Sequence, residues 1–181
     1  MNILCEQQNI VISPEWIPRE NIERADYLSR CLDSDDWLVS VNVFSMLSSK
    51  WGPYSVDRFA SHLNAKCLRF NSRWWVPGCE AVDAMVQWWG KDLNWVVPPP
   101  RLAAECINKI IQEKAKCTVV LPYWKSAAYW TCLTDMYGSY KPFITGVLNL
   151  HRFNVVEKGS GNNGIFAKNP LLFDMLAFKT F

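Results

Sequence analysis

The chain has 181 residues, 50% of them hydrophobic and 20% charged, and a formal net charge of +2. These values are typical of a globular protein with one ordinary core and a small appendage, and so small a charge does not by itself predict a nucleic-acid partner. No apolar run approaches the roughly 20 residues that a membrane-spanning helix needs, so we expect no membrane partner.

Residues 1–37 predict only one strand and one helix. Residues 9–13 are strand-like, Pro14 and Pro18 turn the chain, and residues 19–30 have apolar side chains at helical spacing. Because one strand and one helix cannot bury a core, we expect this segment to be the end of something larger.

The residues of this segment carry a family resemblance. W-I-P-R at residues 16–19, then Asn21, then A-D-Y-L-S-R at residues 25–30 resemble the C-terminal end of the ribonuclease H domain in reverse-transcribing elements. That resemblance implies that Asp26 is the last of four carboxylates that hold two metal ions such as Mg²⁺. The other three would precede Met1, so we expect residues 1–37 to be a remnant. Asp26 would then be vestigial and would bind metal only if the missing part were present.

Residues 38–50 are predicted to form a connector helix, which separates this remnant from an α/β domain over residues 51–181. The acidic run D-S-D-D precedes the helix, and Asp33 or Ser34 is its candidate N-cap. The apolar residues at helical spacing are Trp37, Val41, Phe44 and Leu47.

Strands and helices alternate between residues 51 and 135. Residues 56–60 are strand-like, and residues 81–86 fit either a strand or a short helix. Residues 94–97 predict a buried strand that stops at three prolines. A helix over 101–116, a strand over 117–124 and a helix over 126–135 complete the order expected of an open α/β sheet. Asp57, near a strand's carboxyl end, is a candidate for contacts to ribose hydroxyls.

The motifs of this region resemble a second family. D-x-x-A from Asp57, N-A-K-C-L-R-F at residues 64–70, a strand ending in P-P, and V-V-L-P before an aromatic-rich helix resemble the phage-type Dam family of DNA adenine-N6 methyltransferases. They are also similar to the methyltransferase-like segment that follows ribonuclease H in DIRS-type retrotransposon polyproteins. Together the resemblances cover nearly the whole chain. They imply a Rossmann-like methyltransferase-type sheet, Asp57 and Asn64 as residues that bind S-adenosylmethionine, DNA or RNA as partner, and an upstream reverse transcriptase and ribonuclease H segment.

The family's catalytic motif is Asp or Asn, then Pro, Pro and an aromatic residue. The polar side chain and the adjacent carbonyl bind the exocyclic amine, and the ring stacks on the flipped base. The matching positions here are Val97, Pro98, Pro99 and Pro100. Valine accepts no hydrogen bond, and losing one such contact commonly costs about 100- to 1,000-fold in rate. No G-x-G loop occurs in residues 51–135 either. We therefore expect a degenerate site without a cofactor.

The remaining residues predict a closing sheet. Residues 144–150, 153–156 and 173–181 are strand-like, and we expect them to be antiparallel edge strands.

The seven cysteines form no CxxC pair and no signal peptide precedes them, so we expect reduced thiols in the cytoplasm or nucleus and no secretion. Two distant histidines make a zinc site unexpected.

Three functional hypotheses follow. The first is a truncated retrotransposon-derived fragment whose degenerate DNA adenine methyltransferase-like domain has no independent catalysis. The second is an active S-adenosylmethionine-dependent adenine methyltransferase, in which Asn94 or Asp57 supplies the amine-binding group. The third is a module in which Trp and Arg side chains of residues 69–75 stack on single-stranded nucleic acid.

Overall fold

The computed structural model describes residues 37–152, 154–157 and 170–181, with a few single residues elsewhere. The chain divides by its contacts into Met1–Leu32 and Asp33–Phe181, and every helix and strand described here lies in the second unit. Asp26 and the helix predicted for residues 19–30 lie outside the described residues, as does most of the strand predicted at residues 9–13.

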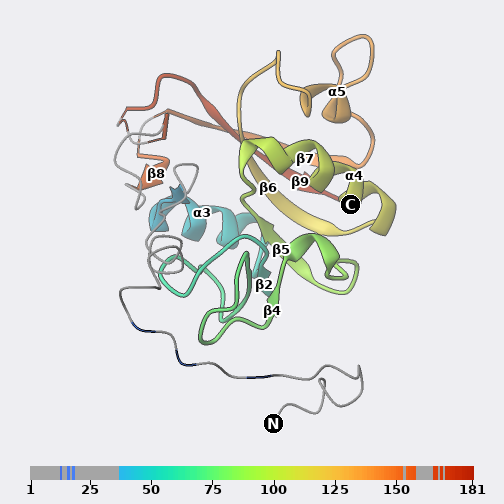
Figure 1. Cartoon of the computed structure of the whole chain (residues 1–181). Coiled ribbons are helices and arrows are strands. Elements are labelled where there is room, and N and C mark those ends of the chain that lie inside the picture. The colour runs from blue at the N-terminus through green and yellow to red at the C-terminus, as the bar shows by residue number, and fades with distance from the viewer. Residues whose placement is uncertain are drawn as a thin grey trace. The chain divides into compact units, whose positions relative to one another are not determined.

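One seven-stranded sheet organises this unit (Figure 1), in the order β4-β3-β2-β5-β6-β9-β7. The first five strands of that order are parallel, and β9 lies antiparallel between β6 and β7. In sheet order the strands are β4 (Ala81–Val82), β3 (Arg69–Ser72), β2 (Val56–Asp57), β5 (Leu93–Val96), β6 (Lys116–Pro122), β9 (Met175–Thr180) and β7 (Ile144–His151). This mixed α/β sheet fits the predicted methyltransferase-type fold.

The strand order reverses beside β2. From β2 the chain passes to β3 and β4 on one side of the sheet, then returns to β5 and β6 on the other. In open α/β sheets, ligands bind beyond the carboxyl ends of the strands at such a reversal. The topology therefore directs attention to the residues that follow β2 and β5.

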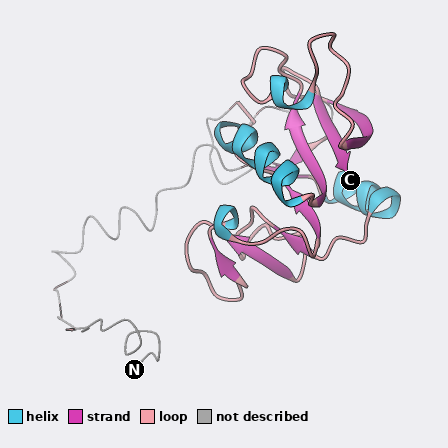
Figure 2. Ribbon diagram, turned by 90° about the vertical axis from the view of Figure 1, so that its right-hand side faces the viewer, coloured by secondary structure: helices cyan, strands magenta, loops and turns pink. Residues whose placement is uncertain are grey.

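Helices cover both faces of the sheet (Figure 2). On α4 (Ala103–Glu113), buried residues recur at helical spacing and pack with Val96 and Val119 in one core cluster. On the other face lies α3 (Val41–Trp51), whose Leu47 is fully buried in a second cluster with Trp95 and Val120. Within the described residues, no helix has the length and apolar character to cross a membrane.

The start of α3 differs from the prediction. Ser40 is its N-cap, since the Ser40 hydroxyl accepts a hydrogen bond from the amide of Val43, so the assignment of the cap to Asp33 or Ser34 was wrong. Trp37 also lies outside the helix. The preceding β1 (Leu38–Val39) pairs antiparallel with β8 (Val156–Glu157), which removes its backbone groups from helix formation.

Other elements also differ from the sequence-based prediction. Residues 81–86 form both expected structures, because Asp83 separates β4 from the 3₁₀ helix η2 (Ala84–Val86). The helix predicted over residues 126–135 is only α5 (Trp130–Leu133). The C-terminal strand is β9, which lies inside the sheet and not at its edge, while β8 joins β1 in a separate two-stranded sheet.

Candidate functional site

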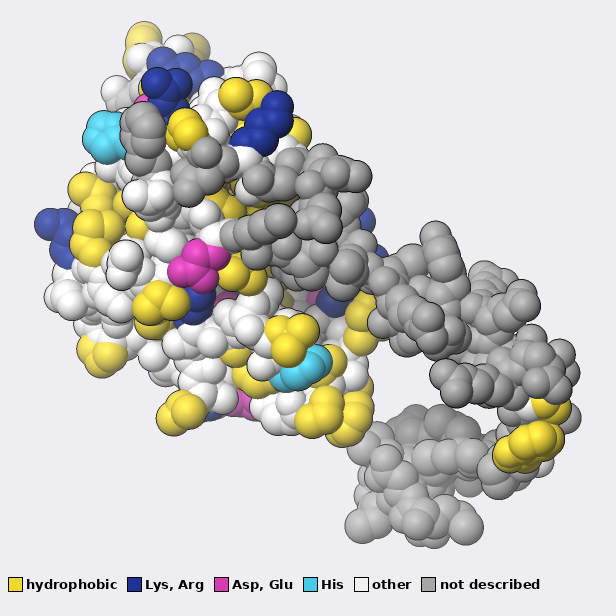
Figure 3. All heavy atoms as spheres, turned by 90° about the vertical axis from the view of Figure 1, so that its left-hand side faces the viewer, with side chains coloured by type: hydrophobic (Ala, Val, Ile, Leu, Met, Phe, Trp, Pro, Cys, Tyr) yellow, Lys and Arg dark blue, Asp and Glu magenta, His cyan; other side chains and the backbone are white. Residues whose placement is uncertain are grey.

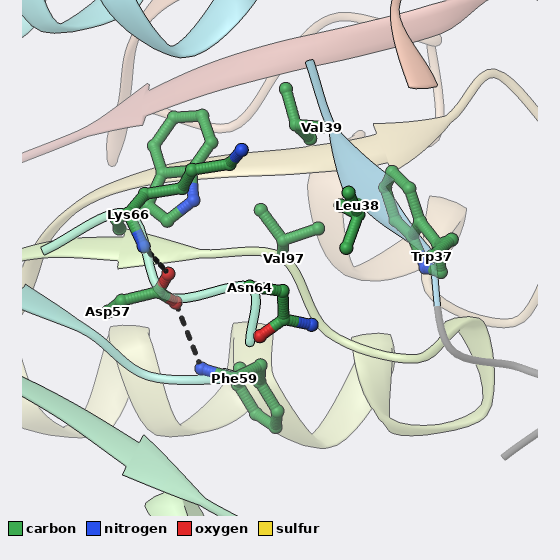
Figure 4. Close-up of a pocket in the computed structure, with 9 residues that line it drawn as sticks. Trp37, Leu38, Val39, Asp57, Phe59, Asn64, Lys66 and Val97 are labelled. Atoms are coloured by element: carbon green, nitrogen blue, oxygen red, sulfur yellow. Dashed lines mark hydrogen bonds between the residues drawn. The ribbon is translucent and has the colours of Figure 1, made fainter. Parts of the chain in front are cut away.

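A small hollow lies at the strand-order reversal. Its free volume is about 10 Å³, roughly the room for one water molecule. Figure 4 shows side chains from the ends of β2 and β5, from the loop after β2 and from β1 around it. The lining residues are Trp37, Leu38, Val39, Asp57, Phe59, Asn64, Lys66, Trp95 and Val97.

Asp57, the last residue of β2, is bonded to the loop that follows it. Its carboxylate is buried, and its two oxygens accept hydrogen bonds from the amides of Phe59 at 3.3 Å and Lys66 at 3.0 Å (Figure 4). Burial raises the pKa of Asp57 from 3.8 to about 6, although both amide hydrogen bonds act to lower it. The carboxylate therefore holds the loop closed over the hollow.

Asn64 stabilises a turn in the same loop. Its Oδ1 accepts hydrogen bonds from the Ser61 amide at 2.6 Å and from the Ser61 hydroxyl at 3.1 Å. Asn64 and Asp57, the two residues predicted to bind the cofactor, thus lie around one hollow, and each accepts hydrogen bonds from the chain itself.

Val97 lies on the same hollow, directly after β5. Its side chain is 9% exposed and belongs to the apolar cluster of Trp37 and Val39. The prolines that follow end the strand and begin a helix. Pro98 is buried, and the carbonyl of Pro99 accepts a hydrogen bond from the amide of Leu102 as the 3₁₀ helix η3 (Pro100–Leu102) starts.

Asn94 belongs to the opposite face of the sheet, because side chains alternate along a strand. It is fully buried, and its Oδ1 accepts a hydrogen bond from Arg58 Nε at 2.7 Å. Its Nδ2 donates to the carbonyls of Trp89, Asp92 and Lys116. Both ends of the Asn94 amide are therefore engaged away from Val97.

Arg58 is the centre of this buried network. Its guanidinium donates to Asn71 Oδ1 at 2.9 Å and to Asp92 Oδ2 at 2.9 Å, in addition to Asn94. The same group lies over the Trp89 ring, with 5.7 Å from Cζ to the ring centroid. These contacts join β2, β3 and the start of β5, so Arg58 holds the central strands together.

Residues 69–75 divide into two groups. Arg69 is engaged with Glu80 and Asp92, and its hydrogen bonds hold the pKa of the Glu80 carboxyl below its usual range. Trp74 and Trp75 are 70% and 75% exposed, and Arg73 lies over the Trp74 ring at 5.2 Å. Arg69 therefore forms ion pairs within the protein, whereas Trp74 and Trp75 are exposed to solvent.

Trp37 and Lys66 line the hollow, although the sequence did not single them out for it. Trp37 is 5% exposed and stacks on Phe166, with ring centroids 4.5 Å apart. Among the described residues its indole Nε1 has no hydrogen-bond partner. Ser40 was the signal that could have removed Trp37 from the predicted helix, because Ser directly before an apolar periodic run is a typical N-cap.

Comparison with known proteins shows which family the chain belongs to. A family model described as DNA N-6-adenine-methyltransferase (Dam) matches residues 29–157, which include the strand-order reversal and every residue that lines the hollow. The chain belongs to this family.

The chain is also similar to a DNA N-6-adenine-methyltransferase of Escherichia phage T1, with 27% identity over 101 residues. That alignment covers 54% of this chain and 40% of the phage protein, so the chain spans less than half the length of this relative. The predicted resemblance to phage-type Dam proteins is thereby confirmed.

The Dam family implies S-adenosylmethionine as cofactor, but the hollow as it stands does not fit this molecule. It has room for about one water, and the Asp57 oxygens already accept two backbone hydrogen bonds. Among the residues that the structure describes, no group of three or more His, Cys, Asp and Glu is placed to hold a metal ion.

Proposed function

We propose that this chain is a Dam-family domain that does not transfer methyl groups by itself. The observation that supports this most is the place of Val97, which lies in an apolar cluster and lines the hollow beside Asp57. The motif resemblance assigns Val97 to the position of the amine-binding Asp or Asn. A valine side chain offers no acceptor to an exocyclic amine. Pro100, in the position of the aromatic residue, gives a poor surface for a flipped base.

The engagement of the two candidate replacements supports this proposal. Asn94 lies on the other face of the sheet, and its amide is bonded to Arg58 and to three carbonyls. Asp57 lies on the correct face, but both of its oxygens accept backbone hydrogen bonds. For Asn94 to bind an amine, hydrogen bonds that stabilise the fold would have to be broken. Asp57 keeps free lone pairs, but it is buried at 3% exposure, and the hollow beside it has room for about one water molecule.

A retroelement origin completes the proposal. W-I-P-R and A-D-Y-L-S-R directly before a Dam-family domain are the order expected of a DIRS-type polyprotein. In that setting Asp26 is a vestigial ribonuclease H carboxylate, and Mg²⁺ belongs to the complete nuclease domain. The natural partner is then the upstream reverse transcriptase and ribonuclease H segment. In-frame reverse transcriptase coding sequence before Met1 supports this origin, and unrelated coding sequence there contradicts it.

The catalytic part is tested with radiolabelled S-adenosylmethionine and adenine-containing DNA. We expect no label transfer by this chain under conditions in which the phage T1 protein labels the same DNA. Calorimetric titration with S-adenosylmethionine is expected to give no binding heat at about millimolar ligand, so any dissociation constant should be weaker than about 1 mM. Label in N6-methyladenine that disappears in the Asp57→Asn variant would instead favour an active enzyme.

A second candidate function is binding of single-stranded nucleic acid. Among the tryptophans of the Asp33–Phe181 unit, Trp74 and Trp75 are the most exposed, and Arg73 adds a cation above the first ring. Figure 3 shows hydrophobic side chains at several places on one face of the molecule. Base stacking on each ring contributes about 1–3 kcal/mol, so Trp74→Ala or Trp75→Ala should weaken binding roughly 5- to 150-fold.

Fluorescence anisotropy with a labelled oligonucleotide measures this loss. Trp88→Ala is the matched control, because Trp88 is 58% exposed but follows η2, away from that loop in the sequence. A loss of equal size in the control, or none in the Trp74 and Trp75 variants, removes this candidate.

A further inference from the structure

The last strand of the sheet, β7, has an outer edge without a partner in the described part of the chain. It has eight residues, more than any other described strand, and it pairs only with β9. The strand at the opposite end of the sheet, β4, has two residues. A long edge strand presents a row of backbone amides and carbonyls that can pair with another strand.

The sequence of β7 lacks the usual protection of an edge. Its residues are I-T-G-V-L-N-L-H, with no Lys, Arg, Asp, Glu or Pro among them. Charged residues and proline are the common means by which proteins prevent strand addition. Register shifts occur only toward the two ends of the strand, so the pairing with β9 is regular over residues 146–149. The middle of β7 is therefore a regular edge that carries no charge.

We propose that β7 pairs antiparallel with β7 of a second copy of this chain, which joins the two sheets across a two-fold axis. A two-fold interface sets the same surface against itself, and antiparallel strand pairing satisfies this symmetry. β7 has no Lys, Arg, Asp or Glu, and with the axis beside Val147 or Leu148 its one titratable residue, His151, does not lie opposite its own counterpart. Arg152, just beyond the strand, falls opposite residues 142–144 of the second copy and not opposite its own counterpart.

The size of the contact sets its strength. Val147 is 36% exposed, and Thr145 and Asn149 are exposed beside it. One added strand pair buries less surface than a standard stable interface, so we expect a weak dimer whose population depends on protein concentration. This dimer depends neither on loss of methyl transfer nor on binding of nucleic acid.

Analytical ultracentrifugation of the full chain between about 1 and 100 μM tests the interface, a range over which the population of a weak dimer should change. A reversible dimer of twice the 20.9 kDa chain mass is expected. Val147→Lys brings two lysines together near the axis and removes an apolar pair, so dimer affinity should fall about tenfold or more. Val86→Lys is the matched control, because Val86 is 73% exposed in η2, after the opposite edge strand, and this variant should dimerise normally.

Hydrogen exchange of the unmodified chain gives a second, independent measurement. The outward amides of residues 144–151 should exchange more slowly at high protein concentration than at low concentration. A monomer at every concentration overturns the proposal, as does a dimer that Val147→Lys leaves intact while circular dichroism shows a folded variant. Slow exchange of these amides in a monomer would also overturn it, since the chain itself would then cover the edge.

Discussion

Ionisation of the buried carboxylate of Asp57 predicts a pH dependence of stability that a single substitution removes. Burial raises the pKa of this group from 3.8 to about 6 in the folded protein. Between these values the folded state keeps a proton that the unfolded chain has released. The free energy of unfolding therefore falls as pH rises from about 4 to about 6, and levels off above that range.

The magnitude follows from the same two values. A shift of about two units corresponds to about 3 kcal/mol, since one unit is about 1.4 kcal/mol. Because titration in the unfolded chain has already begun at pH 4, about 2 kcal/mol of this falls between pH 4 and pH 7. Stability that decreases toward neutral pH is the reverse of the usual contribution of a salt-bridged carboxylate.

Urea unfolding of the native chain and of Asp57→Asn at several values between pH 4 and pH 7 measures this term. The variant loses one acceptor for the amides of Phe59 and Lys66, which lowers its stability by a similar amount at every pH. The stability of the native chain relative to the variant should therefore fall by about 2 kcal/mol from pH 4 to pH 7. Parallel profiles for the two proteins would refute the idea that Asp57 carries a raised pKa behind its closed loop.

Two further predictions concern stability alone. Arg58→Met should lower the free energy of unfolding by about 3–5 kcal/mol in urea denaturation, because it leaves Asp92 and two buried amides without their common donor; a loss below 1 kcal/mol would contradict the central role of this network. Lys114, exposed at the end of α4, has a left-handed backbone with φ of 48°, so Lys114→Gly should raise the melting temperature through a gain of about 0.5–1 kcal/mol. A lower melting temperature would refute that reasoning.

The local features of the fold were predictable because they rest on neighbouring residues. Proline has no amide donor, so β5 had to end before Pro98 whatever its position in the sheet. Apolar spacing likewise predicted α4 and β6. In contrast, the place of β9 between β6 and β7, and the pairing of β1 with β8, depend on contacts between residues far apart in the chain. Periodicity carries no information about such partners.

The candidate site divides in the same way. Sequence motifs assigned Asp57 and Asn64 to cofactor binding and Val97 to the catalytic motif, and in the structure all three line the same hollow. They did not predict that Asn94 faces away from it, because the partner of its amide, Arg58, is 36 residues earlier in the chain. Because side chains alternate along a strand, Asn94 and Val97 lie on opposite faces of the sheet, which the sequence analysis did not take into account when it offered Asn94 as an amine-binding group.

The opposition of these two faces explains how this Dam-family sheet holds together with a valine at residue 97. The polar contacts that hold the central strands, centred on Arg58 and Asn94, lie on the face away from Val97. A change at the motif therefore breaks none of them. On the near face, valine among Trp37, Val39 and Trp95 avoids the cost of burying an amide or carboxylate without a partner. Under the proposal that Val97 replaces an amine-binding Asp or Asn, this packing favours the fold independently of catalytic activity.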